Sequence, residues 1–453
     1  MREQKGEIGS PPAAAGSRKA GNTGYRMKII HCADLHLDSK LHTHLDRVRA
    51  KRRRDELLQN FARLADYAAE NAVEAVLIAG DLFDRDTVSA LARGTVLSVI
   101  RTHPGIRFYY LRGNHDTGDC LRGRHTDDRQ AEIPENLFLF ADRWTTYAEG
   151  RDRDDGQGAV TISGIELPGE NAASAYASLR LDPDRFNIVL LHGQTTGGGT
   201  GSAFRTAAEA DSAFRATAGT GSVFHAATEA GSAFRAAAGT GSVFRAGTGA
   251  GNAPVIDLPS LRGKGIDYLA LGHLHAWKAA PLDDRGIYCY PGCLEGRGFD
   301  ECGPHGFALL DIDEQRRTMT CSFVPFARRT LYALDVDVAG CLTTAQMNDL
   351  VEGALHDAGC TAEDMADVTL LGELDVECEK DIGYLRTNLE GRFFFARLRD
   401  ATALRIEPGE YLYDESLRGE FVRTVLADPS IPEEEKVQII RCGFQAMDGE
   451  ELL

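Results

Sequence analysis

The chain has 453 residues, 43% of them hydrophobic and 26% charged, an ordinary globular composition in a chain long enough for more than one core. It contains no run of eighteen or more apolar residues and no hydrophobic signal core, which argues against a transmembrane span and a secretory signal. The ten cysteines show no repeated CxxC spacing, so we expect reduced thiols, no disulfide framework and a cytoplasmic protein.

The first 26 residues are rich in Gly, Ala, Pro and Ser and carry mixed charge. We expect a disordered N-terminal tail over residues 1–26. The alternative is an upstream translation start whose functional equivalent is Met27.

Five short hydrophobic runs after this tail are each followed by a polar cluster. We predict buried strands, because the runs are apolar and rich in β-branched or aromatic residues. The runs are Lys28–Ala33, Ala75–Ala79, Phe108–Leu111, Ile188–Leu191 and Tyr268–Leu271. The polar residues that follow them are Asp34, His36, Asp81, Asn114, His115, Asp116, His192, His273 and His275. Ligands of open α/β sheets bind beyond the carboxyl ends of the strands, so we expect these side chains to meet in one crevice.

The residue types in this set indicate a centre for two divalent metal ions. Histidine nitrogen with Asp or Asn oxygen, and without Cys, suits Mn, Fe, Zn or Mg. Two pairs are spaced by two residues, Asp34 with His36 and His273 with His275, which points both members of a pair the same way at a strand end. Two ions roughly 4 Å apart can clamp the attacking and leaving oxygens of a phosphoryl displacement. For any single residue a core histidine or a turn aspartate is the simpler interpretation, but the whole ordered set favours the metal centre.

The order of the motifs resembles that of the calcineurin-like metallophosphoesterase superfamily: Asp-x-His, Gly-Asp-x-Phe-Asp, Gly-Asn-His-Asp, His-Gly and Gly-His-x-His. Within it, the chain resembles the SbcD-like DNA-repair exonucleases, bacterial relatives of the meiotic-recombination nuclease. Met27–Asp38 and Tyr290–Glu301 look like the corresponding SbcD-like segments. Gly80–Asp86 and Gly113–Asp116 lack the Val-Asp-Arg-Gly and Gly-Asn-His-Glu sequences of the protein Ser/Thr phosphatases. The resemblance covers about residues 27–325.

The resemblance assigns a role to each polar residue. It implies one metal held by Asp34, His36, Asp81 and His275, and a second held by Asp81, Asn114, His192 and His273, with Asp81 as the bridge and Mn²⁺ as the favoured ion. His115 is left without a metal and is expected to contact the phosphate and help the leaving oxygen depart. Asp116 can orient the His115 imidazole. Asp84 can support the site in a similar way, although a helix N-cap is the simpler interpretation.

The resemblance also predicts an α/β fold and a domain layout. We expect a four-layer α-β-β-α metallophosphoesterase sandwich over residues 27–325, a small α/β capping domain over 326–410 that helps select DNA shape, and a C-terminal helical segment over 411–453. The capping domain is expected to contain strands at Arg329–Val338, Asp367–Val376 and Phe393–Arg399, and helices at Thr343–Ala358 and Lys380–Leu389.

Two amphipathic helices are predicted in the C-terminal segment, at Ser416–Asp428 and Pro432–Met447. Their apolar residues are Phe421, Val422, Val425 and Leu426 on one helix and Val437, Ile439, Ile440 and Phe444 on the next. Such a pair usually packs on its own domain. In SbcD-like proteins the C-terminal helices instead engage an SbcC-like ATPase, and both interpretations stay open.

The net charge of −18 argues against tight non-specific binding to duplex DNA, which Lys and Arg normally drive. A dense basic block nevertheless follows the first motif: Arg47, Arg49, Lys51, Arg52, Arg53 and Arg54. It lies at the start of a predicted helix, Arg52–Glu70. Beside the crevice these side chains can receive phosphates; a solvated helix face balanced by Asp46, Asp55 and Glu56 is the alternative.

Residues 201–250 are a tandem ten-residue repeat inside an insertion that spans residues 197–253. Each copy has Phe followed by Arg or His, at Phe204, Phe214, Phe224, Phe234 and Phe244. Gly and Thr at the junctions break helical continuity, so we expect a disordered loop. The alternative is a flexible arm whose Phe-Arg pairs stack on exposed bases.

The sequence therefore predicts a metal-dependent DNA nuclease, exonuclease or endonuclease, that hydrolyses phosphodiester bonds in DNA repair. The resemblance implies DNA and an SbcC-like ATPase as partners, no membrane, and is compatible with a homodimer. One alternative is a phosphatase or small-nucleotide phosphodiesterase of the same superfamily. Another is a non-catalytic scaffold for an ATPase, which is disfavoured because loss of activity usually erodes ligands and no motif position is missing.

Overall fold

The computed structural model describes residues 26–41, 45–84, 88–116, 120–121, 133–152, 158–167, 172–196, 214–217 and 253–447. These residues form two compact units, the first up to Leu331 and the second from Tyr332 onward. Arg26, predicted as the end of the N-terminal tail, begins the first strand. The rest of the predicted tail lies outside the described residues.

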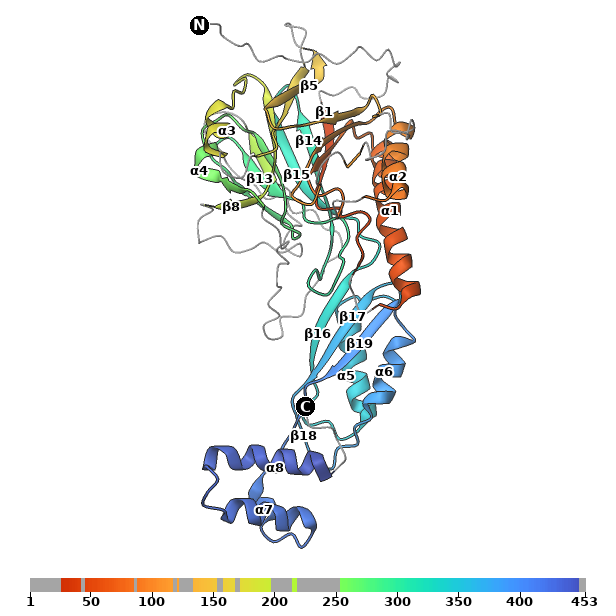
Figure 1. Cartoon of the computed structure of the whole chain (residues 1–453), viewed down its shortest axis with the longest axis vertical. Helices are drawn as coiled ribbons and strands as arrows, with labels where there is room; N and C mark the ends of the chain where they lie inside the picture. Colours follow the sequence, from red (N-terminus) through yellow and green to blue (C-terminus); the bar gives the residue numbers. More distant parts are fainter. Residues whose placement is uncertain are drawn as a thin grey trace. The chain divides into compact units, whose positions relative to one another are not determined.

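The larger β-sheet of the first unit combines a parallel half with an antiparallel edge (Figure 1). Its strands, in spatial order, are β4 (Leu137–Leu139), β3 (Arg107–Leu111), β2 (Ala75–Ala79), β1 (Arg26–Cys32), β14 (Gly306–Asp313), β15 (Thr318–Pro325) and β9 (Phe214–Thr217). Strands β1 to β4 pair in parallel, whereas β14, β15 and β9 are added antiparallel. The carboxyl ends of β1, β2 and β3 therefore point to the same edge of the sheet.

The second sheet has the same design, with a parallel centre and antiparallel edges. Its strands, in spatial order, are β12 (Lys278–Pro281), β13 (Ile287–Tyr290), β11 (Tyr268–Gly272), β7 (Phe186–His192), β6 (Gly158–Gly164) and β5 (Thr145–Asp152). Strands β13, β11, β7 and β6 are parallel. A separate ribbon pairs β8 (Gln194–Thr196) with β10 (Val255–Asp257).

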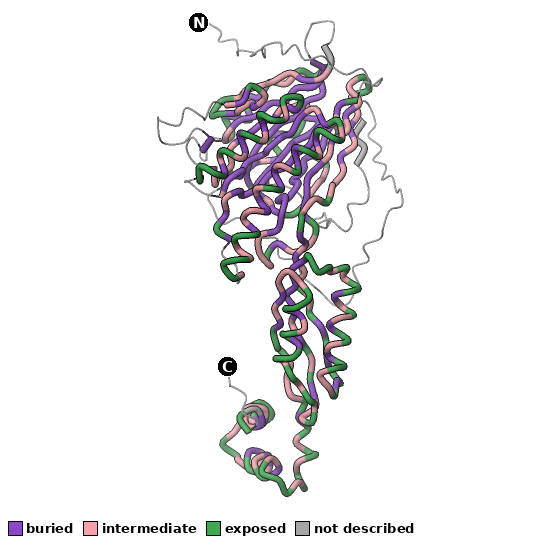
Figure 2. Tube along the Cα trace, turned by 90° about the vertical axis from the view of Figure 1, so that its right-hand side faces the viewer, coloured by how far each residue is buried: buried purple, intermediate pink, exposed green. Residues whose placement is uncertain are grey.

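The two sheets share one apolar core and helices cover their outer faces (Figures 1 and 2). Side chains from both sheets fill the space between them, for example Leu77 and Tyr109 from the first and Leu190 and Tyr268 from the second. Helices α1 (Arg47–Glu70) and α2 (Ala90–Thr102) pack on the first sheet, and α3 (Ala172–Ser178) and α4 (Leu258–Leu261) pack on the second. The predicted α/β fold with four α-β-β-α layers is confirmed.

The five predicted strands that precede the motifs are confirmed as β1, β2, β3, β7 and β11, with ends within two residues of the prediction. Helix α1 begins earlier than predicted, at Arg47, because Asp46 caps it. The Asp46 carboxylate accepts the backbone N–H groups of Val48 and Arg49 at 2.8 and 2.9 Å. The basic block thus forms the first two turns of the helix.

Four residues of the tandem repeat form β9, which pairs with the edge of β15. The predicted disordered loop is therefore wrong for Phe214–Thr217. An edge strand presents unpaired N–H and C=O groups that an added segment can satisfy, which explains this pairing. The other residues of the repeat lie outside the described part of the chain.

The second unit begins with a three-stranded sheet, in the order β16 (Leu331–Asp337), β17 (Met365–Leu371) and β19 (Phe395–Asp400). Helices α5 (Thr344–Asp357) and α6 (Ile382–Glu390) contribute to its core. The predicted strand Asp367–Val376 is split into β17 and β18 (Glu373–Leu374). Gly372 lies between them with a φ of 110°, a left-handed conformation that interrupts the strand.

The C-terminal part of this unit contains β20 (Ala403–Leu404), which pairs with β18, then the 3₁₀ turn η2 (Pro408–Tyr411) and helices α7 (Leu417–Ala427) and α8 (Glu433–Met447). The predicted apolar faces of α7 and α8 form one small core, in which Val422 and Phe444 are fully buried. Val437 was also predicted on this face, but it is 36% exposed and does not belong to this core. Within the described residues, no helix has the length and apolar character needed to cross a membrane.

Candidate metal centre

The polar loops after β1 and β2 are held side by side by backbone hydrogen bonds. The Asp34 N–H donates to the Gly80 carbonyl, and the His36 N–H donates to the Asp81 carbonyl, both at 3.0 Å. The second sheet is joined to this edge through its β11 loop, because the His273 N–H donates to the Asp34 carboxylate at 2.9 Å. Motifs that are far apart in the sequence therefore meet at one place.

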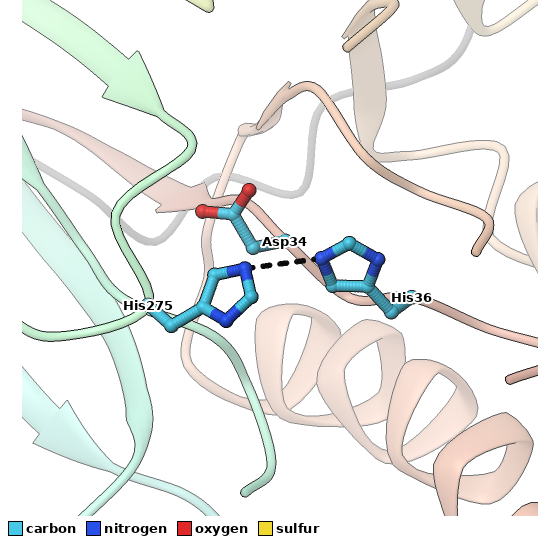
Figure 3. Close-up of side chains that lie close together, drawn as sticks. All are labelled: Asp34, His36 and His275. Atoms are coloured by element: carbon cyan, nitrogen blue, oxygen red, sulfur yellow. Dashed lines mark hydrogen bonds between the residues drawn. The ribbon is translucent and has the colours of Figure 1, made fainter. Parts of the chain in front are cut away.

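Asp34, His36 and His275 form the first group of candidate ligands (Figure 3). Their donor atoms lie within 4.8 Å of one another, and all three residues are buried. The Nε2 atoms of the two imidazoles face each other at 3.2 Å beside the carboxylate. The group has the nitrogen and oxygen donors that suit a divalent cation.

Each imidazole of this group has a carboxylate behind it. The His275 Nδ1–H donates to Glu301 at 2.7 Å. His36 Nδ1 lies 3.2 Å from Asp84 Oδ1, although the two atoms are not aligned as a hydrogen bond. With hydrogen on both Nδ1 atoms, both Nε2 atoms present lone pairs to the same point. Facing lone pairs repel unless a cation lies between them, so the two rings fit a metal ion.

A second group surrounds His192. Its donor atoms lie within 4.8 Å of those of Asp34 and Asp81. His192 Nε2 is 3.4 Å from Asp81 Oδ2 and 2.9 Å from Asn114 Oδ1, and the His192 Nδ1–H donates to the Ala79 carbonyl at 2.9 Å. The His273 ring lies edge-on to His192, with centroids 5.7 Å apart. All seven predicted metal ligands thus lie at this edge of the two sheets.

Asp81 stands between the two groups. Its Oδ2 atom is 3.4 Å from His192 Nε2 and 3.9 Å from His36 Nε2. Burial alone would raise the pKa of the Asp81 carboxyl, but His192 and His36, together with the His115 N–H, hold that pKa well below its usual range. Burial opposes charge on His192 too, yet Asp81 and Asp34 raise its pKa. The Asp81 carboxylate therefore stabilises positive charge on the neighbouring imidazoles, and a bound cation would supply positive charge at the same place.

Several candidate ligands adopt a strained backbone conformation. Asp34, His36, Asp81 and His273 have φ values of 54°, 44°, 51° and 107°. A left-handed conformation in a non-glycine residue costs about 1–3 kcal/mol and persists only when its surroundings fix it. The backbone hydrogen bonds of the loops after β1, β2 and β11 provide that fixation.

Two motif glycines are explained by close approach. A Cβ atom on Gly80, whose φ is 94°, would overlap the His192 ring, and a Cβ atom on Gly113 would overlap the Asp81 carboxylate. Each glycine therefore lets a ligand side chain lie directly against the neighbouring loop.

His115 lies beside the first group. Its N–H donates to Asp81 Oδ1 at 2.8 Å, and its ring is edge-on to His36 with centroids 4.9 Å apart. The ring is half-buried, with Nδ1 3.4 Å from the Asp84 carbonyl oxygen. Its donor atom also lies within 4.8 Å of those of His36 and Asp81. His115 is thus near enough to act on a phosphate bound at this edge.

Asp116 has a different role from the one predicted. Its carboxylate accepts the backbone N–H groups of Leu82, Phe83 and Gly113 at 3.0, 2.8 and 3.1 Å. These bonds engage both oxygens in holding the loops after β2 and β3 together, so Asp116 positions the loop of His115 and not its imidazole. Asp84 is not a helix N-cap, because Ser89 caps α2 by accepting the Ala92 N–H at 3.2 Å.

The prediction of a DNA-binding role is wrong for one residue of the basic block, Arg53. Arg53 is 1% exposed and donates to Glu56, to Glu295 and to the Gly296 carbonyl at 3.1, 2.8 and 2.6 Å. Arg329 is fully buried and binds Glu56 from the other side. Arg53 therefore belongs to a buried ionic network and is not available to phosphate. The others, Arg47, Arg49, Lys51, Arg52 and Arg54, are exposed or half-buried.

Comparison with known proteins identifies the family. Residues 27–277, more than half of the chain, match the family described as calcineurin-like phosphoesterase. The chain belongs to this family. The phosphoesterase is therefore a hydrolase of a family that uses divalent metal ions, and its cluster of buried His and Asp donors agrees with that chemistry.

Two curated relatives are similar to this phosphoesterase. The uncharacterized metallophosphoesterase YhaO of Bacillus subtilis is 24% identical over 294 residues, which are 63% of this chain and 57% of that protein. The DNA double-strand break repair protein Mre11 of Aeropyrum pernix is 26% identical over 319 residues, which are 69% of this chain and 64% of that protein. The chain thus spans less than two thirds of the length of either relative.

Solved structures also resemble it at low identity. One is TT1561 of Thermus thermophilus, at 11% identity and a TM-score of 0.34, covering 66% of this chain and 98% of that one. Another is a dimetal phosphatase from Danio rerio, at 9% identity and a TM-score of 0.33, covering 66% and 99%.

Glu301 is a residue of the site that was not predicted from the sequence. This residue ends the segment Tyr290–Glu301, which was noted only for its resemblance to SbcD-like proteins. Its 2.7 Å contact with His275 joins residues that are separated by β12, β13 and their loops, so no regular spacing could reveal it. The available signal was that the segment lies after the last His motif.

Proposed function

We propose that this phosphoesterase is a DNA nuclease with a binuclear metal centre. In this proposal Asp34, His36, Asp81 and His275 hold one cation, and Asp81, Asn114, His192 and His273 hold the other, with Mn²⁺ as the favoured ion. The position of Asp81 is the observation that carries the proposal. One carboxylate oxygen lies within 4 Å of imidazoles from both groups, as a bridging ligand requires.

The chemistry of the centre follows from its residues. Two bound cations supply charge that stabilises a phosphoryl transition state and lower the pKa of a water. His115 is placed to donate a proton to the departing oxygen, because its ring lies beside both His36 and Asp81. Asp116 keeps His115 in place through the backbone of its loop.

DNA as the substrate is supported by the resemblance of the motifs to SbcD-like nucleases and by the similarity to the archaeal Mre11. We also propose that phosphates of the DNA contact the exposed and half-buried residues of the basic block: Arg47, Arg49, Lys51, Arg52 and Arg54. We further propose that the second unit helps select DNA shape, and that α7 and α8 engage an SbcC-like ATPase. A homodimer and a cytoplasmic location belong to the same proposal.

The test compares substrates with Mn²⁺ present: blunt and hairpin duplex DNA, bis(p-nitrophenyl) phosphate as a small diester, and p-nitrophenyl phosphate as a monoester. We expect cleavage of DNA and of the diester, and more DNA cleavage when an SbcC-like ATPase is added. Hydrolysis of the monoester or of small nucleotides without DNA cleavage would instead support the phosphatase alternative. A protein that binds no metal and cleaves nothing would support the scaffold.

A further inference from the structure

Arg297 lies behind the first group of ligands and contacts both carboxylates that back the imidazoles. Its Nη1 donates to Asp84 Oδ1 at 3.0 Å, and its Nη2 donates to Glu301 Oε1 at 2.8 Å and also lies 3.2 Å from His275 Nδ1. Those carboxylates lie 3.2 Å from His36 Nδ1 and 2.7 Å from His275 Nδ1. The five side chains form a continuous ring of contacts. It closes where the Nε2 atoms of His36 and His275 meet, and Figure 3 shows this contact.

The ring is largely shielded from water. The side chains of His36, His275 and Glu301 are 1%, 4% and 4% exposed, and those of Asp84 and Arg297 are 20% and 21% exposed. Charge-assisted hydrogen bonds in such a place are strong, and the planar guanidinium can contact two carboxylates at fixed angles. Lysine keeps the charge but lacks this planar fork of donors.

The loop that carries Glu301 is itself fixed against the metal centre. The Cys293 N–H donates to the His275 carbonyl at 3.1 Å, and His305 Nε2 lies 2.9 Å from the Glu301 carbonyl. Cys293 Sγ and His305 Nδ1 are 3.1 Å apart, which joins these two anchors. The Glu301 carboxylate therefore has little freedom to move away from His275.

The second group of ligands lacks this arrangement at its central imidazole. His192 Nδ1–H donates to a backbone carbonyl, that of Ala79, and not to a carboxylate. A carboxylate partner fixes the ring and makes its other nitrogen a stronger ligand, and loss of such a partner typically costs about 10–100-fold in metal affinity. The two halves of the centre should therefore respond differently when charge behind the imidazoles is removed.

We propose that Arg297, acting through Asp84 and Glu301, is a positioning residue that orients His36 and His275 and sets the affinity of this half of the centre for its cation. The inference rests on the proposed binuclear centre. The guanidinium keeps the two carboxylates turned toward the Nδ1 atoms, so both Nε2 lone pairs point to one position. Without Arg297 the carboxylates repel each other and at least one imidazole is free to turn.

The test is calorimetric titration of the metal-stripped full chain with Mn²⁺. Wild type should show two binding events. Arg297→Met should weaken one event by about 10–100-fold and leave the other unchanged. Arg297→Lys, which keeps the charge, should shift the same event by less and covers the case in which the Met variant does not fold.

Arg285→Met is the matched control. Arg285 is similarly exposed, at 25%, and binds the buried Asp267 through two hydrogen bonds of 2.8 and 3.0 Å. Asp267 precedes β11, at the opposite end of the strand from His273. The control should lower the melting temperature without changing either Mn²⁺ event. Unchanged Mn²⁺ affinities in Arg297→Met, or the same selective loss in Arg285→Met, would overturn this inference but not the proposed function. If the wild-type protein binds no Mn²⁺, both the inference and the proposed function are overturned.

Discussion

The two compact units of this phosphoesterase differ in where they place charge and strain. In the first unit, buried Asp and His side chains gather at one edge, and four of the ligands have left-handed backbones. Among the described residues, every non-glycine residue with positive φ lies in this unit. In the second unit, the Arg405–Asp375 ion pair is exposed, and the buried Asp367 carboxylate is paired with Arg397 and Arg399.

The first unit therefore holds its candidate ligands in place at a cost in local stability. The second unit shows no such strain among its described non-glycine residues. Strained residues and like charges that lie close together persist only where the rest of the structure fixes them. Substitutions among the candidate ligands of the first unit should therefore change metal binding and small-diester hydrolysis, and substitution of a buried charge in the second unit should change neither.

The largest effect is expected for Asp81→Asn. Loss of the shared carboxylate should remove at least one Mn²⁺ and lower hydrolysis of a phosphodiester by about 10³-fold or more, since the cations contribute several kcal/mol to the transition state. Elemental analysis measures the Mn²⁺ content, and an assay with bis(p-nitrophenyl) phosphate measures the rate of hydrolysis. Asp367→Asn is the control, because Asp367 is also 2% exposed but pairs with Arg397 and Arg399 in the second unit. Equal loss of metal in both variants would contradict a specific role of Asp81 in metal binding.

His115→Ala should separate metal binding from hydrolysis within the first unit. We expect wild-type Mn²⁺ content and a fall of about 10²–10⁴-fold in the rate of DNA cleavage, because a proton donor is lost and no predicted ligand is. Rates at saturating substrate and elemental analysis test this. Loss of metal, or full activity, would contradict the assigned role.

The affinity for Mn²⁺ should rise with pH. Burial raises the pKa of Asp34 to about 6, and Asp81 and Asp34 raise that of His192. Mn²⁺ binding requires an ionised Asp34 and a neutral His192, so each of these groups releases a proton when the ion binds. The affinity should therefore rise by up to about tenfold per pH unit for each proton released. Because the folded pKa of Asp34 is raised, its contribution to the stability of metal-free protein is present below its unfolded value of 3.8 and is lost as pH rises through 6. Calorimetry at about pH 5.5 and 7.5 tests this, and equal affinities would refute it.

Phe444→Ala should affect the second unit alone. Removing this fully buried ring from the core of α7 and α8 should cost about 3–5 kcal/mol of local stability. Faster proteolysis or hydrogen exchange of these helices would show it, while hydrolysis of a small diester stays at the wild-type rate. Val437→Ala, at a position 36% exposed, serves as the mild control. A loss of diester hydrolysis in Phe444→Ala would mean that the two units do not act separately.

Replacement of residues 197–252 by a Gly/Ser linker of about a dozen residues, which keeps the parallel strands β8 and β10 connected, should have the smallest effect. The repeat is poor in core-forming residues, and β9 adds to an edge of the sheet away from the parallel strands that carry the ligands. We expect unchanged nuclease activity and unchanged affinity for single-stranded DNA. Weaker single-strand binding would instead favour an arm that stacks Phe and Arg on bases.

Much of the fold was predictable because its signals are local. Each strand that precedes a motif is a short apolar run, and parallel strands bring their ends to one edge, which places Asp34, Asp81 and His192 together. The cap Ser416 also sets a predicted helix start through a nearby backbone N–H group. Asp46 gave the same kind of signal, but the helix was predicted to begin only at Arg52. The strand break at Gly372 had the same kind of local signal, a glycine inside an apolar run.

What escaped prediction depends on contacts between distant charges. Arg53 looked like part of an exposed basic block, yet it is buried because Glu295, 242 residues away, neutralises it. Asp116 was expected to orient an imidazole, but the backbone N–H groups of a neighbouring loop take up its oxygens. Neither partner can be identified from spacing along the chain.

The most direct test of the binuclear centre is the anomalous diffraction signal of manganese in crystals of the full chain grown with Mn²⁺. The account predicts two peaks roughly 4 Å apart, both within bonding distance of the Asp81 carboxylate, one beside His36 and His275 and the other beside His192. Absence of manganese from this edge of the sheets, or one ion that does not contact Asp81, would contradict it.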